Sequence, residues 1–186
     1  TKPVRAVDDI HFLTREEQAI FLETAKRSHN YRQYVLLLET GLRTSELIGL
    51  TWDSIDWKKH ALTINKTLEY RHKNKCWRAG PPKTEKSYRT IPLTDRAYAV
   101  LKSCYDERDS RKESDTLSQV LEYIDRRTGR TGTLVMKDLV FINYRTGEPA
   151  KNSSYDTHLY KLCDEAGIEH FCMHALRHTY ATRAIE

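Results

Sequence analysis

The pattern of apolar and polar positions predicts helices in the first part of the chain. Residues 14–17 form a capping box, and the helix after it has apolar residues at helical spacing: Ala19, Ile20, Leu22 and Ala25. Residues 31–40 form a second, more apolar helix that we expect to be buried, with Gly41 at its C′ position. A short helix should follow from about residue 44 to residue 50.

The apolar pattern then changes to the period of strands. Residues 52–57 and 61–70 are typical of strands, joined by a turn at 58–60. Residues 88–93 predict another strand, and a helix should begin at Thr94 and Asp95 and run to about residue 108. The middle of the chain is therefore predicted to hold a small sheet.

The most polar part of the chain is residues 108–132, which we interpret as an insertion outside the main core. Within it, residues 114–127 have a weak helical pattern, and residues 128–132 are typical of a flexible loop. Beyond it, residues 139–143 predict a short strand and residues 144–149 a turn.

Two helices are expected in the last part of the chain. Asn152 should cap the first, which runs to Ala166 and is closed by Gly167. The second should begin near Met173 or His174 and continue to the last residue. The order of helices, then strands, then helices predicts a mainly helical α+β domain with a small antiparallel sheet on one side.

Composition bounds the class of protein. The 186 residues correspond to one domain, 1–186, which is long enough to bury a core without disulfides or metals. With 39% hydrophobic and 31% charged residues and a mean hydropathy of −0.71, no apolar stretch approaches the ~20 residues of a membrane span. The first residues also lack a signal sequence and an initiator Met. We therefore expect a non-membrane protein, truncated at both ends of a longer chain.

Basic charge is concentrated in one segment. The chain has a net charge of +5 and a pI of about 9.0. Residues 71–89 contain one acidic residue, Glu85, and seven basic ones: Arg71, Lys73, Lys75, Arg78, Lys83, Lys86 and Arg89. A focused basic patch in a nearly balanced chain predicts a polyanionic partner such as nucleic acid. A solvated charged hairpin is the alternative, and charge alone does not distinguish the two.

The cysteines form no framework. Cys76, Cys104, Cys163 and Cys172 include no CxxC pair, so we expect reduced thiols in a cytoplasmic protein. A possible metal cluster near the end of the chain comprises His170, Cys172, His174 and His178. No acidic residue lies between its histidines as in HExxH, and a second regular ligand set is absent, so no metal is expected.

Three segments carry residues suited to phosphate chemistry: 40–47, 82–89 and 174–179. Arg43 follows a helix-ending glycine, and Glu46 lies one turn further on, where it can orient the guanidinium. The alternative is an exposed ion pair worth about 0.3 kcal/mol. The turn at 80–82 predicts that Lys83 projects from a loop or from the first residue of a strand.

The third segment adds a histidine and a second arginine. His174 and Arg177 are one turn apart near the start of a helix, so they face the same side, close to a terminus that favours anions. Two arginines, one lysine and one histidine converging on one point can bind and activate a phosphodiester, and arginine holds two oxygens at once, as lysine cannot.

These three segments together resemble the catalytic domain of tyrosine recombinases, the phage-integrase family. The matching stretches are TGLRTSEL, KTEKSYRTIPL and HALRHTYAT, and the resemblance spans about residue 13 to the end, apart from the polar insertion. It implies catalytic residues at Arg43, Lys83, His174 and Arg177, with Glu46 in support. We expect a structural role for His178, because it lies four residues from His174 and faces the next turn of the helix. The resemblance implies cleavage and rejoining of double-stranded DNA through a 3′-phosphotyrosyl link, without metal, ATP or other cofactor, by a homotetramer on DNA.

The chain departs from the family pattern at both ends. The nucleophilic tyrosine of the family lies well downstream of the second arginine, and none of the eleven tyrosines here occupies that place. Tyr180 is better interpreted as a packing residue. The upstream DNA-binding domains of the family are also absent. Because the nucleophile is missing, we expect this chain alone to bind duplex DNA weakly without cutting it. A non-enzymatic DNA-binding module and a type IB topoisomerase-like domain are the alternatives.

Overall fold

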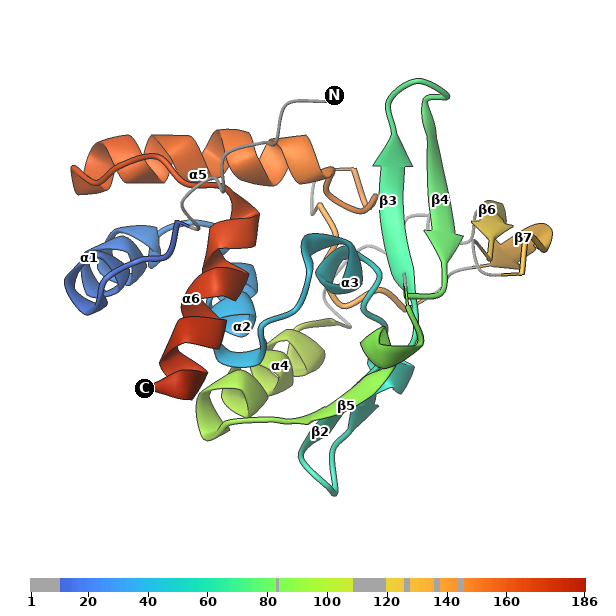
Figure 1. Ribbon diagram of the computed structural model, residues 1–186, viewed down its shortest axis with the longest axis horizontal. Coiled ribbons are helices and arrows are strands. Elements are labelled where there is room, and N and C mark those ends of the chain that lie inside the picture. Colours follow the sequence, from blue (N-terminus) through green and yellow to red (C-terminus); the bar gives the residue numbers. More distant parts are fainter. Residues whose placement is uncertain (1–10, 83, 109–119, 126–127, 136–137, 144–145) are drawn as a thin grey trace, which may run out of the picture.

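The computed structural model describes residues 11–82, 84–108, 120–125, 128–135, 138–143 and 146–186. Its helices are α1 (Arg15–Ala25), α2 (Tyr31–Thr40), α3 (Thr44–Ile48), α4 (Asp95–Asp106), α5 (Asn152–Ala166) and α6 (Met173–Ile185). Figure 1 shows α6 lying across α2, with α5 along one side of the helical body and the strands at the other end. The mainly helical α+β fold is confirmed, and so are the predicted helices that lie outside the polar segment 108–132.

Local signals act at the helix ends as the sequence predicts. The Thr14 hydroxyl accepts from the Glu17 amide at 3.1 Å, and the Glu17 carboxylate accepts from the Thr14 amide at 2.8 Å, which completes the capping box. Gly167 ends α5 in the left-handed conformation, with φ 66°. One boundary differs from the prediction: Lys151 occupies the N-cap position of α5, and Asn152 is the first helical residue.

The described strands form two sheets. The first contains β1 (Ile55–Asp56), β2 (Ala61–Ile64) and β5 (Arg89–Pro92), all antiparallel, in that order. The second has the order β3-β4-β6-β7, from β3 (Thr67–Arg71), β4 (Cys76–Gly80), β6 (Val120–Ile124) and β7 (Thr131–Val135). In this sheet β4 and β6 run parallel and the other neighbours run antiparallel, so the second sheet is mixed.

The single strand predicted over residues 61–70 is wrong, because β2 and β3 belong to different sheets. Leu62, Ile64 and Leu68 are buried at alternate positions, but Lys66 occupies the position between the last two. Its ammonium reaches the Asp53 carboxylate at 3.0 Å. A lysine at an inward position interrupts the apolar alternation, and the chain changes sheet there.

Two further strand predictions need correction. The segment predicted as a strand at 52–57 begins as a 3₁₀ turn over Trp52–Ser54 and pairs only over β1. Residues 139–143 form no strand: Leu139 makes an isolated bridge to Thr51, and the Val140 amide donates to the Leu50 carbonyl at 2.8 Å. Burial of Leu139, Val140 and Phe141 explains their apolar character without a strand.

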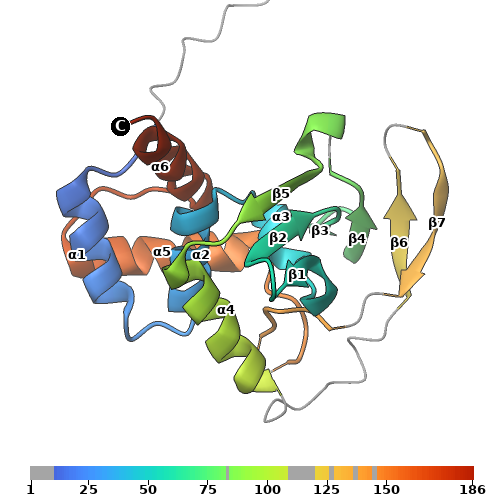
Figure 2. The ribbon, with the colours of Figure 1, turned by 90° about the horizontal axis from the view of Figure 1, so that it is seen from below.

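The weak helix predicted at 114–127 is wrong over Val120–Ile124, which is β6. Figure 2 shows the β6–β7 hairpin at the outer edge of the molecule, beside β4 and away from the helices. The edge of β4 leaves backbone groups that need partners, and β6 supplies them by pairing with Arg78 and Ala79. The first part of the predicted insertion, residues 109–119, lies outside the described residues.

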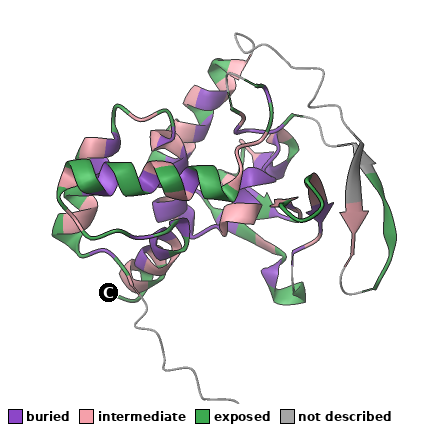
Figure 3. Ribbon diagram, turned by 90° about the horizontal axis from the view of Figure 1, so that it is seen from above, coloured by how far each residue is buried: buried purple, intermediate pink, exposed green. Residues whose placement is uncertain are grey.

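The core forms around α2, whose side chains at Tyr34, Val35, Leu36 and Leu37 are at most 1% exposed. Figure 3 shows the buried residues concentrated where the helices meet. Helix α2 packs against α4 on one side and α6 on another, so it is apolar around most of its circumference. No helix in the described ranges combines the length and apolar character that crossing a membrane requires.

The junction after α2 depends on a glycine for two reasons. Gly41 has φ 61°, and a Cβ built on it would lie 2.3 Å from the Cδ1 atom of Tyr180 in α6. The Tyr180 ring therefore packs directly on the backbone between α2 and α3, and the packing role predicted for this tyrosine is confirmed. This contact brings the residues that follow α2 close to the middle of α6.

We predict that Gly41→Ala destabilises the domain by about 2–4 kcal/mol, the sum of a left-handed backbone cost and overpacking. Gly167→Ala is the matched control, because φ there is 66° but no atom lies within 4 Å of the added methyl group. The Gly167→Ala variant should lose only about 1 kcal/mol of its free energy of unfolding. Urea denaturation measures both, and equal losses would show that Tyr180 moves aside without cost.

Candidate active site

Arg43 stands at the start of α3 and is held by a buried carboxylate. The Arg43 amide donates to Glu46 Oε2 at 2.8 Å, and its guanidinium Nη1 donates to Glu46 Oε1 at 2.9 Å. The Glu46 side chain is 1% exposed, whereas that of Arg43 is 40% exposed. The geometry is that of a buried anchor with an accessible guanidinium, so the alternative of a wholly exposed ion pair is wrong.

Glu46 has a second arginine partner that sequence reasoning placed elsewhere. Arg89 in β5 donates to Glu46 through Nη1 at 3.1 Å and through Nη2 at 2.8 Å. Its place in the basic segment 71–89 predicts, on charge alone, that Arg89 contacts DNA. The alternation of the strand indicates an inward position for Arg89, because Arg89 shares a face of β5 with the buried Ile91.

Glu46 is ionised despite its burial. Burial raises the pKa of this carboxyl and is the largest single effect. Hydrogen bonds and positive charge from Arg89 and Arg43 together outweigh burial, and they hold the pKa of Glu46 below its usual range. The buried position is therefore a fixed negative charge between two guanidinium groups.

The second predicted arginine reaches the same region from α6. Arg177 Nη1 donates to the Gly41 carbonyl, two residues before Arg43. Burial and then the charges of Arg43 and Arg89 lower the pKa of Arg177, and Glu46 opposes this. The three guanidiniums thus lie close enough to repel one another around one carboxylate, an arrangement that favours an added anion.

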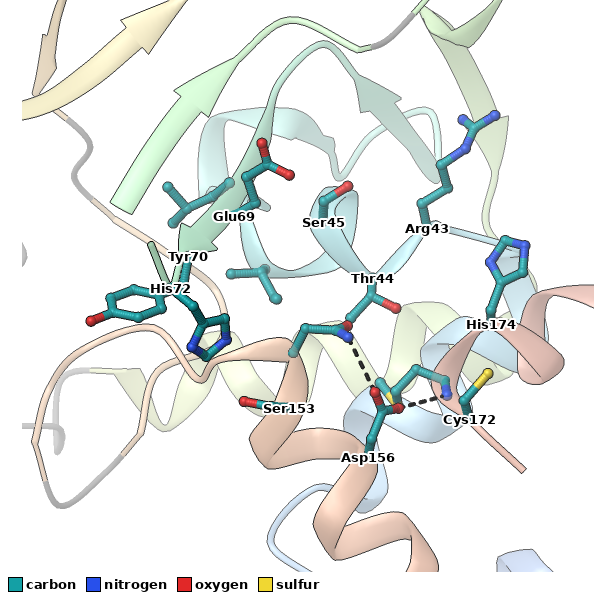
Figure 4. Close-up of a pocket in the computed structure, with 14 residues that line it drawn as sticks. Arg43, Thr44, Ser45, Glu69, Tyr70, His72, Ser153, Asp156, Cys172 and His174 are labelled. Carbon is teal, nitrogen blue, oxygen red and sulfur yellow. Dashed lines mark hydrogen bonds between the residues drawn. The ribbon is translucent and has the colours of Figure 1, made fainter. Parts of the chain in front are cut away.

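His174 lies beside Arg43, as the close-up in Figure 4 shows. Burial lowers the pKa of His174, and the neighbouring His178, Arg177 and Arg43 lower it further. The imidazole is therefore neutral near pH 7 and able to accept a proton. The ring of His178 meets that of His174 edge-on at 4.5 Å, so the two histidines pack together.

A residue that sequence reasoning missed holds the start of α6. Asp156 of α5 accepts from the Met173 amide at 3.0 Å and from the Asn152 side chain at 3.1 Å, as the dashed lines in Figure 4 mark. This carboxylate caps a helix that begins seventeen residues later, in place of the N-cap residue Cys172. Arg43, His174 and Asp156 all line one open cavity of 560 Å³.

The basic segment contains residues that are paired with a carboxylate and residues that are exposed. Arg71 and Arg78 both contact Glu69, Arg71 at 3.4 Å, and the Arg78 side chain is only 12% exposed. Lys73 and Lys75 lie on the exposed loop of the β3–β4 hairpin, and Lys86 is exposed between β4 and β5. No carboxylate in the described part of the chain pairs with these three lysines. Lys83 itself lies outside the described residues.

The possible metal ligands do not converge. His170 bonds to Asp164 at 2.6 Å, while His174 packs on His178. Among the residues that the structure describes, no group of three or more His, Cys, Asp or Glu side chains is arranged to hold a metal ion.

Comparison with known proteins decides the family. The sequence model of the phage integrase family matches residues 11–186. The chain belongs to the phage integrase family. This confirms the resemblance drawn from the three motif segments, all of which lie inside the matched range.

Relatives of this integrase-family domain include a transposase and a tyrosine recombinase. It is 30% identical over 182 residues to a transposase from transposon Tn916 of Enterococcus faecalis, covering 91% of this chain and 40% of that protein. It is 27% identical over 179 residues to an XerC-like tyrosine recombinase of Caldanaerobacter subterraneus, covering 92% and 42%. The domain thus spans about two fifths of the length of these relatives.

Solved structures show the same fold. The Tn1549 transposon integrase in complex with circular intermediate DNA superposes with a TM-score of 0.72 at 24% identity, covering 94% of this domain and 54% of that chain. The XerA recombinase superposes with a TM-score of 0.67 at 21% identity, covering 100% and 53%. The integrase-family domain therefore has the fold of these recombinases.

We predict that the stability of the domain depends on pH through Glu46. Because its folded-state pKa is depressed, ionised Glu46 stabilises the fold above the unfolded-state pKa of about 4.3, and this contribution is lost as pH falls through the folded-state value. Glu46→Gln should cost about 3 kcal/mol at pH 7, and its deficit against wild type should shrink below about pH 4.5.

Denaturation series from pH 7 to pH 3 measure this difference. The exposed Glu16 of α1 provides the control variant, Glu16→Gln, which should follow wild type within about 0.5 kcal/mol. A deficit of Glu46→Gln that stays constant across the whole pH range would contradict the assignment of a depressed pKa.

Proposed function

We propose that this domain binds and activates the scissile phosphate of double-stranded DNA in a site-specific recombinase. The observation that supports the proposal is the pairing of Arg43 and Arg89 with the buried carboxylate of Glu46, with Arg177 and His174 close enough to feel the same charges. Three cations against one anion in a partly buried site leave positive charge uncompensated. A phosphodiester that gains negative charge in its transition state suits such a site.

Arg43 and Arg177 are proposed as the phosphate-binding pair. The pair is anchored to different groups, Arg43 to Glu46 and Arg177 to the Gly41 carbonyl, so the side chains approach from separate elements. Each is proposed to hold a non-bridging oxygen and to stabilise the charge that develops on it. By analogy with the arginines of phosphoryl transfer, each contributes a factor on the order of 10³.

The proton transfers are assigned to Lys83 and His174. In the proposed reaction a tyrosine oxygen forms a bond to phosphorus while the bond to the 5′-oxygen breaks. The 5′-oxygen then leaves with a proton from Lys83, an assignment that depends on the motif alone. The tyrosine hydroxyl loses its proton as its oxygen bonds to phosphorus, and His174, neutral near pH 7, is proposed to accept that proton. The phosphotyrosyl bond conserves the energy of the broken one, so no nucleotide is required.

The tyrosine nucleophile is not assigned within this chain. Tyr180 is committed to packing on Gly41, and none of the other tyrosines follows Arg177. We therefore propose that the chain by itself forms no covalent DNA adduct, and that the complete gene product supplies the tyrosine. The related Tn1549 integrase was solved with DNA, which supports duplex DNA as the partner.

The remaining assignments concern the surroundings of the reaction. We propose that Lys73, Lys75 and Lys86 contact the DNA backbone, while Arg71 and Arg78 brace the hairpin through Glu69. We propose a homotetramer on DNA, with no cofactor, acting in the cytoplasm. Cys76, Cys104, Cys163 and Cys172 form no disulfide with one another.

We predict that Arg43→Lys or Arg177→Lys in the complete gene product reduces cleavage of a suicide duplex on the order of 10³-fold, with DNA binding within threefold of wild type. A point charge cannot replace a bidentate guanidinium in the transition state. Denaturing gels measure the covalent protein–DNA band. Near-normal cleavage by the lysine variants would refute the phosphate-binding role, and a band from the present chain alone would reveal a nucleophile among its eleven tyrosines.

We predict that Lys73→Ala with Lys75→Ala flattens the slope of log K against log salt by about 1.8, from roughly 0.9 per phosphate contact. The loss should be equal on specific and random duplexes. Arg78→Ala is the control from the same hairpin, since its charge is already paired with Glu69 and should change the slope by less than about 0.5. An unchanged slope in the lysine variant would show that the hairpin loop faces solvent.

A further inference from the structure

The guanidinium of Arg43 is anchored through one nitrogen only. Its Nη1 group donates to Glu46 Oε1 at 2.9 Å and to the Ser87 hydroxyl at 3.3 Å, which uses both Nη1 hydrogens. Within the described part of the chain, Nε and Nη2 of Arg43 have no protein acceptor. These two nitrogens form one edge of the guanidinium, with N–H bonds directed the same way, which is the geometry that holds two phosphate oxygens.

Arg89 is bonded in the opposite manner. Both terminal nitrogens donate to the two oxygens of Glu46, and Nη1 also donates to the Ser87 carbonyl at 3.1 Å. Its side chain is 25% exposed, less than that of Arg43. The Nη1–Nη2 end of the Arg89 guanidinium is therefore occupied by protein acceptors.

Ser87 closes these contacts into a ring. Its hydroxyl accepts from Arg43, its carbonyl accepts from Arg89, and both arginines donate to Glu46. The residue is 4% exposed, and its hydroxyl also bonds to Thr84 Oγ1 at 2.9 Å. A guanidinium cannot accept a hydrogen bond, so the direction of each arginine contact in the ring is determined. Two acceptors on one nitrogen fix the rotation of the Arg43 plane.

We propose that Arg89 is a positioning residue, which holds Arg43 through Glu46 and Ser87 with its Nε–Nη2 edge directed at the scissile phosphate. The inference rests on the proposed phosphate-binding role of Arg43. It replaces the expectation that Arg89 grips the DNA backbone.

The charges around Glu46 determine how the loss of Arg89 changes the protonation of this carboxylate. The carboxylate faces Arg43 from its own helix, Arg89 from β5 and Arg177 from α6, while Arg78 and Glu69 lie across a small cavity of 140 Å³. Removal of Arg89 takes away two of the hydrogen bonds that Glu46 accepts, so a buried carboxylate then becomes easier to protonate. A protonated Glu46 accepts less well from Arg43, and the guanidinium loses its orientation as pH falls.

The test compares Arg89→Ala and Arg89→Lys in the complete gene product, with single-turnover cleavage of a suicide duplex measured from pH 5 to pH 8. We expect Arg89→Ala to lose about 10²-fold in cleavage at pH 7, the cost of a misplaced catalytic group, with the loss growing toward pH 5. Arg89→Lys should recover part of the rate. The salt slope of DNA binding should change by less than about 0.5, whereas Lys86→Ala should change it by about 0.9, as a backbone contact does.

A double-mutant cycle separates action through Glu46 from direct action on DNA. In a Glu46→Gln background, Arg89→Ala should cost less than threefold further, because the ring is already broken. The inference would be overturned if the cleavage rate of the double variant fell by the product of the two single-variant losses. A salt slope of DNA binding reduced by about one unit in Arg89→Ala would also overturn it. Thermal denaturation shows whether each variant is folded. If Arg89→Ala does not fold, the comparison is made with Arg89→Lys alone.

A direct measurement on the present chain keeps the inference separate from the proposed function. Carbon-13 NMR of the Glu46 carboxyl should show its titration moved to higher pH in Arg89→Lys or Arg89→Ala. If wild-type complete protein forms no covalent adduct, the proposed function fails while this titration still tests the ring. A Glu46 titration that does not move would refute the positioning role of Arg89.

Discussion

The buried carboxylate of Glu46 is the interaction on which the site depends. A carboxylate that is 1% exposed must be paired, because an isolated charge in the interior is strongly unfavourable. Glu46 resolves this requirement by accepting from the backbone and side chain of Arg43 and from both ends of the Arg89 guanidinium. The need to satisfy one buried charge therefore joins α3 to β5 and sets the orientation of two arginines.

A second constraint brings α6 to this centre. The left-handed Gly41 lets the chain turn between α2 and α3, and the Tyr180 ring packs against its backbone. The same turn directs the Gly41 carbonyl at Arg177, so one tight junction places Arg177 and presents Arg43 two residues later. The separation of the two proposed phosphate ligands is thus a property of backbone packing, which is stiffer than any pair of long side chains.

The positive potential of the site results from three arginine side chains that lie close together. Arg43, Arg89 and Arg177 repel one another, and the same charges lower the pKa of His174. Glu46 offsets one of these charges and leaves the rest uncompensated. The fold tolerates this imbalance because its core around α2 is apolar and closely packed. A phosphate group would relieve the repulsion, which makes the site more favourable with substrate than without it.

The sequence by itself determined those features that depend on neighbours in the chain. The Thr14–Glu17 capping box, the left-handed Gly41 and the apolar periods of α1 and α2 are local, so helices and their ends could be predicted closely. The motif segments likewise predict Arg43, Glu46, His174 and Arg177 as site residues, because each kind of side chain is suited to phosphate chemistry and the segments occur in the family's order.

Only the tertiary structure decided how distant segments pair. The division of residues 61–71 between two sheets, the parallel pairing of β4 with β6 and the capping of α6 by Asp156 all join groups that local patterns do not relate. Arg89 shows the reason most clearly. Its charge is equally compatible with solvent, DNA or a buried carboxylate, and the choice depends on whether a partner stands opposite its strand face. Glu46 stands there because α3 packs beside the sheets, a fact of three-dimensional packing rather than of sequence spacing.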